Sequence, residues 1–318
     1  MPQCEEAPLR LRSENGVGGI VVIYQSTGLG MRVGLIGLGM MGWRIAANLA
    51  SDGLLAAVYN RTARKAEEFS KKYGVAAAAS AEELVKMADV VVTVLSDDEA
   101  VSEVVGSLLP HLGGKVLVDM STISPTTSQR LAAEVSKRGG LMYDAPVIGT
   151  SVAAEKRQIV VLVGGPREGF SQVEQVLKHV AAAVVYVGPN GYGLYAKLAN
   201  NLLIGAYVAA LAEAVNFGLK AGLSPQFLTE LFTKYSSARS PTSELKTPKM
   251  LSKDYSVQFA LKHMRKDLEI VQQEAKNLKA AVPLSALSLQ LYRLAEAMGL
   301  SETDFSAVLE LLRGIHQK

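Results

Sequence analysis

The sequence has a single cysteine, Cys4, among 318 residues. A lone cysteine excludes a disulfide framework within the chain and a cysteine-based zinc site, and it fits a reducing compartment, so we expect the protein in the cytoplasm. The four histidines are scattered, without the paired spacing or the carboxylates of a metal site, and we predict no metal. The net charge is +3 with no run of lysines and arginines, which argues against nucleic acid as a partner.

Long apolar runs are absent from the first thirty residues. The run at residues 20–24 is too short to span a membrane, and the segment lacks the basic start and longer apolar core of a signal peptide. Two interpretations stay open for residues 1–30: a peripheral extension or a start assigned too early, and an added edge strand at residues 19–24. We assign this segment no function.

From Met31 onward the chain has the pattern of an ordinary globular protein, with 49% hydrophobic and 20% charged residues and a length that allows two domains. Short apolar runs alternate with amphipathic stretches of helix length, which predicts βαβ units and a parallel sheet. Helix starts are marked by a capping box, Ser80 with Glu83, and by Ser124 followed by Pro125. The predicted strands are residues 33–36, 55–59, 90–94, 116–118, 141–143, 159–163 and 184–187, with a helix at 166–179 between the last two.

The pattern changes near Gly193. Residues 194–221 form about seven helical turns without proline, apolar nearly all the way round, and Gly222 follows as a helix stop. Such a helix is buried in a core or spans a membrane. Five polar residues argue against a lipid span: Lys197, Asn200, Asn201, Glu213 and Asn216. Further helices are predicted at residues 224–233, 259–278, 284–297 and 302–315, so we expect an all-α C-terminal domain without a membrane segment.

A glycine-rich loop directly follows the first predicted strand and opens a helix at residues 41–50. Its first glycine permits a tight turn, its second lets the backbone approach a pyrophosphate, and its third lets helix and strand pack closely. The helix N-terminus then presents unpaired N–H groups to phosphates. This strand–loop–helix context predicts dinucleotide binding, whereas an isolated motif would indicate only a tight turn. The predicted cofactor-binding residues of the loop are Gly37, Leu38, Gly39, Met40, Met41 and Gly42.

The end of the second predicted strand indicates which dinucleotide binds. An NAD enzyme usually has an acidic residue about 20 residues past the glycines, which accepts hydrogen bonds from the ribose 2′-hydroxyl. Asn60, Arg61 and Thr62 stand there instead, followed by Arg64 and Lys65. A neutral residue with cations nearby suits a 2′-phosphate and so favours NADP. In the alternative interpretation, the cations are only a solvated helix start.

Lys197 and Asn201 lie four residues apart near the start of the long apolar helix, and therefore one turn apart on one face. Burial would lower the pKa of the lysine from about 10.4 toward the range of a general acid or base. Lys266 or a cationic nicotinamide nearby would lower it further. The alternative is a lysine that extends to the surface at a domain junction, and the spacing alone favours neither.

Four separated motifs lie between residues 31 and 316. They are the glycine loop with Ala46-Ala47-Asn48-Leu49, Asp119-Met120-Ser121-Thr122, Gly191 to Asn201, and Lys266-Asp267-Leu268. In order and spacing they resemble the motifs of the β-hydroxyacid dehydrogenases, the group of 3-hydroxyisobutyrate dehydrogenase.

The resemblance implies that Lys197 is the catalytic acid–base, that Asn201 orients the substrate, and that Ser121 holds the substrate carboxylate beside the cofactor. It also implies that Lys266 lies near the cofactor and that Phe259 lines the site.

One segment departs from the pattern of that family. Where the family usually has Asp-Ala-Pro-Val-Ser-Gly-Gly, this chain has Ile148 in place of the serine and Thr150 in place of the last glycine, and a glycine usual near Arg157 is missing. These changes fall in the family's substrate loop, so they bear on substrate identity. The Thr150 hydroxyl would suit a polar substituent such as the amino group of L-serine. The predicted substrate-binding residues are Ser121, Thr122, Gly149, Thr150, Lys197, Asn200, Asn201 and Phe259.

The sequence thus predicts an α/β Rossmann-type dinucleotide-binding domain followed by an all-α C-terminal domain. We expect residues 1–30 to be an extension of unknown role, residues 31–192 the NADP-binding domain, and residues 193–318 a helical substrate and oligomerisation domain. The expected activity is NADP-dependent oxidation of the 3-hydroxyl of a small acid of the L-serine, 3-hydroxyisobutyrate or glycerate type. We expect a homodimer or homotetramer formed through the C-terminal helices.

Other proteins on this scaffold are the alternatives. A short-chain semialdehyde reductase of the succinic or glyoxylate type would use the same site. A non-catalytic homologue lacks the lysine that this chain has, and an imine reductase usually carries another residue at the position of Lys197. A 6-phosphogluconate dehydrogenase shares the pattern around Lys197 but needs a much longer helical domain.

Overall fold

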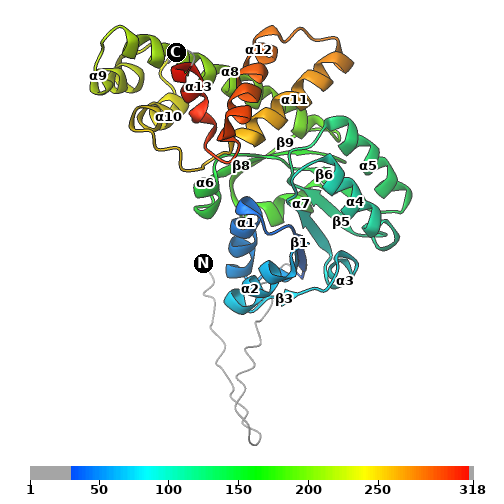
Figure 1. The fold of residues 1–318 in the computed structure, drawn as a ribbon. Coiled ribbons are helices and arrows are strands. Elements are labelled where there is room, and N and C mark those ends of the chain that lie inside the picture. Colours follow the sequence, from blue (N-terminus) through cyan, green and yellow to red (C-terminus); the bar gives the residue numbers. More distant parts are fainter. Residues whose placement is uncertain (1–29, 315–318) are drawn as a thin grey trace, which may run out of the picture.

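The computed structural model describes residues 30–314, so the edge strand considered for residues 19–24 lies outside the described part of the chain. Within residues 30–314, strands alternate with helices as far as Gly188, and helices with their connecting turns make up the rest. The predicted fold class is therefore confirmed. Figure 1 shows the two parts one above the other, with the sheet and its helices below and helices α8 to α13 above.

The first part is built on a nine-stranded sheet in the order β3-β2-β1-β4-β5-β6-β8-β7, with β9 paired to β8. The pairs among β1 to β6 are parallel, as predicted, and so is the β8–β9 pair. The strands are β1 (Val33–Ile36), β2 (Leu55–Tyr59), β3 (Ala76–Ala77), β4 (Val90–Thr93), β5 (Val116–Asp119), β6 (Leu141–Asp144), β7 (Val147–Ile148), β8 (Ile159–Gly164) and β9 (Ala181–Gly188).

Strand β8 runs antiparallel to both β6 and β7, a reversal that the sequence pattern did not indicate. A parallel return needs a crossover of a dozen or more residues, usually with a helix on the face of the sheet. Only residues 149–158 connect β7 to β8, and they hold the short helix α6 (Ser151–Glu155). The chain therefore turns back on itself, and the segment between β6 and β8 becomes a loop at the carboxyl edge of the sheet.

Alternate residues of the strands face two different helical layers, because side chains of a strand point to opposite faces of the sheet. Leu35 in β1 belongs to the apolar core under α1 (Met40–Ser51), α2 (Ala63–Tyr73) and α7 (Phe170–Leu177). Its neighbour Ile36 belongs to the core under α3 (Ala81–Met87), α4 (Asp98–Leu108) and α5 (Pro125–Lys137). The sheet is thus covered on both faces, which is usual for parallel strands.

The predicted helix starts are present, with one difference. Ser124 accepts a hydrogen bond from the backbone N–H of Thr127 at 3.2 Å, with Pro125 in the first turn of α5. Ser80 accepts from Glu83 N at 3.1 Å, but the Glu83 carboxylate accepts from Ala79 N at 2.6 Å rather than from Ser80 N. The expected capping box at Ser80 is therefore only half formed, because the glutamate reaches one residue further back.

The second part is a helical domain around α8 (Tyr192–Lys220), which is 29 residues long and close to its predicted bounds. By length and composition alone α8 would be able to cross a membrane. It is instead the central helix of this domain and contacts all five α-helices that follow it, α9 to α13. The other elements are α9 (Pro225–Glu230), η2 (Leu231–Tyr235), α10 (Pro241–Ser252), α11 (Leu261–Leu278), α12 (Pro283–Ala295), η3 (Glu296–Leu300), η4 (Phe305–Ala307) and α13 (Val308–Gly314).

Helix α10 is absent from the sequence prediction, because Pro248 interrupts its helical pattern. A proline inside a helix removes one hydrogen bond and normally ends or kinks the helix. Here the helix start is strong: the side chains of Ser240 and Ser243 form a capping box, and Pro241 occupies the first turn. Burial of Met250 against the helical core adds apolar contacts that propensity alone does not include.

The junction between the two parts is fixed at the start of α8 by the buried carboxylate of Asp144. One of its oxygens accepts from Gly191 N at 2.6 Å and the other from Leu194 N at 3.0 Å. Gly193 and Gly164 allow the close approach, because a Cβ on either residue would lie within 2.8 Å of an Asp144 oxygen. Asp144 therefore ties the end of β6 to the first turn of α8.

A second contact joins the domains through Glu274 of α11, which is buried. Its carboxylate accepts hydrogen bonds from the hydroxyl of Thr126 in α5, at 2.9 Å, and from the hydroxyl of Tyr195 in α8, at 3.0 Å. Burial, followed by the adjacent Glu274 carboxylate, raises the pKa of Tyr195 to about 12. The three side chains hold α5, α8 and α11 together where the two parts meet.

Candidate active site

The glycine loop between β1 and α1 has the geometry that its sequence predicts. Gly37 has φ +102°, and a Cβ there would lie 2.2 Å from the Val94 carbonyl oxygen. A Cβ on Gly42 would lie 1.9 Å from the Gly37 oxygen, so this glycine lets the helix start pack on the turn. A Cβ on Gly39 would meet no atom within 4 Å. The middle glycine thus faces open space, where a pyrophosphate needs close access to the backbone.

Asn60, Arg61 and Thr62 follow β2 beside this loop but do not line either of the two cavities described below. The Asn60 side chain accepts a hydrogen bond from Leu38 N at 2.9 Å and donates one to the Thr62 carbonyl oxygen at 3.1 Å. Asn60 therefore holds the glycine loop against the end of β2. The Arg61 side chain is exposed, and within residues 30–314 it forms no ion pair.

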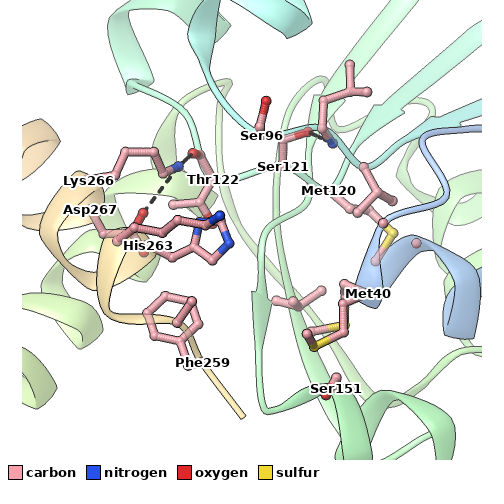
Figure 2. Close-up of a pocket in the computed structure, with 18 of the residues that line it drawn as sticks. Met40, Ser96, Met120, Ser121, Thr122, Ser151, Phe259, His263, Lys266 and Asp267 are labelled. Atoms are coloured by element: carbon pink, nitrogen blue, oxygen red, sulfur yellow. Dashed lines mark hydrogen bonds and ion pairs between the residues drawn. The ribbon is translucent and has the colours of Figure 1, made fainter. Parts of the chain in front are cut away.

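A first cavity of about 430 Å³ lies between the glycine loop and the helical domain. Gly39 to Gly42 form one end of it, and Ser121, Thr122, Gly149, Lys197, Phe259 and Lys266 are among its other lining residues. Figure 2 shows Phe259 and Lys266 on one wall, with Met40 and Ser151 on the wall opposite. The fold therefore brings the predicted loop, carboxylate-binding residue and lysines to one space.

Lys197 is buried in the first turns of α8, with 8% of the residue exposed. Burial lowers the pKa of its ammonium group; Asp267 opposes this shift, whereas Lys266 lowers the pKa further. Within residues 30–314, the Lys197 ammonium group has no hydrogen-bond or ion-pair partner. The alternative of a lysine that extends to the surface is therefore wrong. An amine of this kind exchanges a proton near neutral pH more readily than an exposed lysine.

Asn201 and Lys266 both contact the buried carboxylate of Asp267, whose charge also acts on Lys197. The Asn201 side-chain amide donates to one Asp267 oxygen at 2.6 Å, and the Lys266 ammonium lies 3.3 Å from the other. Lys266 also donates a hydrogen bond to the carbonyl oxygen of Thr122. Because Asn201 donates to Asp267, its side-chain oxygen is the acceptor, and it receives a hydrogen bond from Asn200 at 3.0 Å.

Ser121 lies in the loop after β5, where its hydroxyl is already engaged. It donates to an oxygen of Asp119 at 2.6 Å and accepts from Leu95 N at 2.8 Å. Asp119 is fully buried, and burial raises the pKa of its carboxyl group. Thr122 lines the first cavity, and within residues 30–314 its hydroxyl and its backbone N–H form no hydrogen bond.

A second cavity of about 310 Å³ continues from the first, and Gly149, Lys197 and Phe259 line both. Asn200, Asn201 and Thr150 line the second cavity. The Thr150 hydroxyl oxygen accepts from Ala153 N at 3.3 Å and so begins helix α6. The predicted substrate-binding residues are thus divided between two connected cavities that share the lysine.

In the segment that departs from the family pattern, Arg157 adopts the backbone conformation expected of the glycine that is missing near it. Arg157 has φ +57°, the left-handed conformation that glycine adopts most easily and that costs other residues about 1–2 kcal/mol. Its guanidinium forms two hydrogen bonds of 2.8 Å to the carboxylate of Asp52 at the end of α1. His179 also contacts Asp52, at 2.6 Å. The ion pair offsets part of the backbone cost and holds the segment after α6 against α1.

Ionisable residues beyond those predicted also line the first cavity, among them His263 and Asp267. His263 precedes Lys266 by three residues and therefore lies on the same face of α11; Figure 2 shows both at the cavity. Asp267 lies within the Lys266-Asp267-Leu268 motif but received no role. The helical spacing of His263 from Lys266 was a usable signal, whereas the contact of Asp267 with Asn201 depends on the packing of α11 against α8.

These features together define an oxidoreductase of the dinucleotide-binding class, because a glycine loop shares one cleft with a buried lysine that has no partner in the described part of the chain. Comparison with known proteins agrees. The sequence profile described as the NAD binding domain of 6-phosphogluconate dehydrogenase matches residues 32–188. The profile described as NAD-binding of NADP-dependent 3-hydroxyisobutyrate dehydrogenase matches residues 191–312.

Individual relatives support the same family. The mitochondrial 3-hydroxyisobutyrate dehydrogenase of Mus musculus is 35% identical, over 88% of this chain and 87% of its own. The chloroplastic glyoxylate/succinic semialdehyde reductase 2 of Arabidopsis thaliana is 31% identical, over 88% of this chain and 79% of its own. A solved 3-hydroxyisobutyrate dehydrogenase of Mycobacterium tuberculosis with L-serine has a TM-score of 0.82 at 29% identity and covers 89% of this chain and 99% of its own. The chain belongs to the β-hydroxyacid dehydrogenase family, that of 3-hydroxyisobutyrate dehydrogenase.

The buried lysine generates the first prediction. Because the folded-state pKa of Lys197 lies below its unfolded value of about 10.4, the folded protein binds fewer protons, and the lysine costs stability at neutral pH. We expect Lys197→Met to raise Tm at pH 7, by an amount that shrinks as the pH approaches 10.4. The same variant should lose at least about a hundredfold in kcat, the usual contribution of an acid–base group.

Calorimetry at several pH values and steady-state kinetics check this prediction. Lys234→Met is a control, because Lys234 is exposed, is paired with Glu230 and lines neither cavity. A Lys197→Met protein that keeps its turnover would exclude Lys197 as the acid–base group, whereas a lower Tm at pH 7 would contradict the cost assigned to its burial.

Proposed function

We propose that this protein oxidises the 3-hydroxyl of a small 3-hydroxy acid of the L-serine, 3-hydroxyisobutyrate or glycerate type, with NADP as the cofactor. The observation that carries the proposal is the buried ammonium of Lys197, which has no partner within residues 30–314 and lies where the first cavity meets the second. A purely structural lysine at this depth would need an acceptor for its charge. A non-catalytic homologue offers no reason to keep it.

Each side chain then has one task in the oxidation. Bound NADP supplies the hydride acceptor. Lys197, as the neutral amine, takes the proton from the 3-hydroxyl, and Asp267 helps to hold the resulting ammonium ion. Asn201, fixed by its bond to Asp267, orients the substrate. In the reverse direction Lys197 returns the proton to the carbonyl oxygen, so a semialdehyde reductase would use the same residues.

The preference for NADP rests on the charges after β2. Within residues 30–314, Arg61 forms no ion pair, whereas Arg64 is paired with Glu68 at 2.7 Å. No acidic residue occupies positions 60–65, where an NAD enzyme would bind the ribose 2′-hydroxyl. A free guanidinium suits a phosphate, because arginine recognises phosphate oxygens through two hydrogen bonds.

We expect Arg61→Ala to lower kcat/KM for NADP at least about tenfold, equivalent to about 1.4 kcal/mol, and to leave kcat/KM for NAD within twofold. Arg64→Ala is the matched control, because it removes a guanidinium that Glu68 already occupies. Steady-state kinetics with both cofactors measure the difference. Equal losses with NADP and NAD would show that Arg61 has a structural role.

The substrate carboxylate is assigned to the loop after β5, which ends at the edge of the sheet where ligands of open α/β folds bind. The Ser121 hydroxyl donates a hydrogen bond to Asp119, so it can donate to a substrate carboxylate only when this bond to Asp119 is broken. The neighbouring Thr122 offers a hydroxyl and an N–H without partners in the described chain. Ser121 and Thr122 together would supply the charge-assisted bonds that hold an anionic oxygen.

We expect Thr122→Val, which keeps the shape of the side chain, to raise KM for the acid at least about tenfold while KM for NADP changes less than twofold. Ser121→Ala should also raise KM for the acid. It adds a structural effect, because the backbone N–H of Leu95 loses its acceptor. The measurement compares each 3-hydroxy acid with its methyl ester. Equal kcat/KM for acid and ester would exclude this loop as the carboxylate anchor.

A stripe on α12 and η3 supports self-association of the helical domain. Leu284, Leu287, Leu294 and Met298 repeat with the three- and four-residue spacing of a coiled-coil seam, and between 52% and 70% of each residue is exposed. Leu291 continues the spacing between them. Apolar patches on a protein surface generally mark sites that bind a partner, and a seam of this kind matches a second copy of itself.

We expect Leu287→Glu to shift the protein toward a smaller assembly, which light scattering after size-exclusion chromatography would detect. Val185→Glu is the control, because Val185 is an exposed apolar residue in the dinucleotide-binding part. A wild-type protein that is monomeric at micromolar concentration would contradict the proposal, as would an unchanged mass for the Leu287→Glu variant.

A further inference from the structure

The second cavity is larger than a three-carbon acid requires and is lined mostly by apolar side chains. Its volume is about 310 Å³, and it begins at Lys197, where the proposed reaction takes place. Met264 and Phe305 are buried parts of its wall. The apolar lining residues are Ile148, Ile204, Pro241, Leu245, Phe259, Met264 and Phe305. Ile148 stands where the family usually has a serine, so the altered loop itself adds to this apolar surface.

The charge on the wall of this cavity is already neutralised. Apart from Lys197, the one charged lining residue is Lys246, whose ammonium lies 2.9 Å from each oxygen of Asp304 and 3.1 Å from the Gln258 side-chain oxygen. Lys246 and Asp304 are both buried, and the ammonium also lies over the Phe305 ring, 4.7 Å from its centre. All three donors of the ammonium therefore have acceptors within the protein.

These charges decide which substituents the second cavity would accept. A second carboxylate would find no unpaired cation there other than Lys197, which the reaction itself uses. A substrate ammonium group, as in L-serine, would find no carboxylate, because none of the described residues that line this cavity is acidic. Either charged group would lose its hydration without gaining a counter-charge. An apolar group would lose nothing on leaving water.

We propose that the substrate is a 3-hydroxy monocarboxylic acid with an uncharged, apolar branch longer than methyl on C2, and that the second cavity holds this branch. The proposal rests on the proposed function, which places the carboxylate at Ser121 and Thr122 and the 3-hydroxyl at Lys197. C2 lies between these two held groups, so a branch on C2 leaves both contacts in place. The branch then extends past Lys197 toward Ile204 and Met264.

The test is a series of 3-hydroxypropanoates with hydrogen, methyl, ethyl, propyl or butyl on C2, compared with 2-(hydroxymethyl)glutarate and L-serine. Each methylene that enters an apolar cavity contributes about fourfold in binding. We expect kcat/KM to rise at least about tenfold from methyl to propyl. The dicarboxylate and L-serine should both fall at least about tenfold below the propyl compound. Values that stay flat or fall along the alkyl series would overturn the inference.

The outcomes separate the two proposals. Oxidation of the unbranched and methyl acids without a gain from longer branches would reject only the apolar branch. Oxidation of none of the acids would reject the proposed function and, with it, this inference. Faster oxidation of L-serine or 2-(hydroxymethyl)glutarate than of the propyl compound would show that the second cavity accepts charge.

A variant tests whether the second cavity is the site of the branch. Leu245 lies at its rim with 40% of the residue exposed, so Leu245→Lys adds an unpaired cation without burying it. We expect the ratio of kcat/KM for 2-(hydroxymethyl)glutarate to that for the propyl compound to rise at least about tenfold. Leu278→Lys is the matched control, since Leu278 is exposed and lines neither cavity. An unchanged ratio in Leu245→Lys would overturn the placement of the branch.

Discussion

The carboxylate of Asp144 binds the backbone N–H groups of Gly191 and Leu194, and through them it fixes where the helix that carries Lys197 begins. A helix start has N–H groups without partners inside the helix, and a buried start needs an acceptor for them. Burial raises the pKa of Asp144 to about 6. Because the strand and the helix that Asp144 joins belong to different domains, this contact sets the position of Lys197 relative to the first cavity.

Buried ionisable groups concentrate around the same cleft, and each has a different balance of burial and pairing. Lys246 and Asp304 neutralise each other, and Asp304 also accepts from Phe259 N at 3.2 Å, so the pair positions an aromatic wall of both cavities. Asp267 is held between Asn201 and Lys266. Lys197 alone among these buried cations has no partner in the described chain. Ionisable groups with perturbed pKa values in a cleft often belong to a catalytic site. Both the position of Lys197 in the cleft and its lowered pKa therefore support a catalytic role for it.

The loop that departs from the family pattern combines two structural adjustments with one change in its surface. Thr150 serves as a helix cap, and Arg157 keeps the left-handed backbone of a glycine with help from Asp52. Ile148 has no such local role, and its side chain adds apolar surface to the second cavity. The altered residues thus serve the local structure of the loop and change the surface of the second cavity.

The sequence by itself determined the elements whose information is local. The spacing of Gly37, Gly39 and Gly42 after a strand was enough to predict the loop geometry, because the tight turn and the close packing that require glycine arise within the loop and its flanking strand and helix. The length and apolar character of α8, with Lys197 and Asn201 one turn apart, could likewise be predicted from the sequence pattern. Resemblance to a family then connected motifs that lie far apart in the chain.

Tertiary structure alone decided contacts between residues that are distant in sequence. The pairing of Lys246 with Asp304 spans 58 positions, and the contact of Asn201 with Asp267 spans 66, so no periodicity reports either of them. The burial of Lys197, which the spacing left open, depends on α11 packing across α8. The pKa of an ionisable group follows from its surroundings in space, and for this reason the local sequence named the lysine while only the packed domains made it a candidate acid–base group.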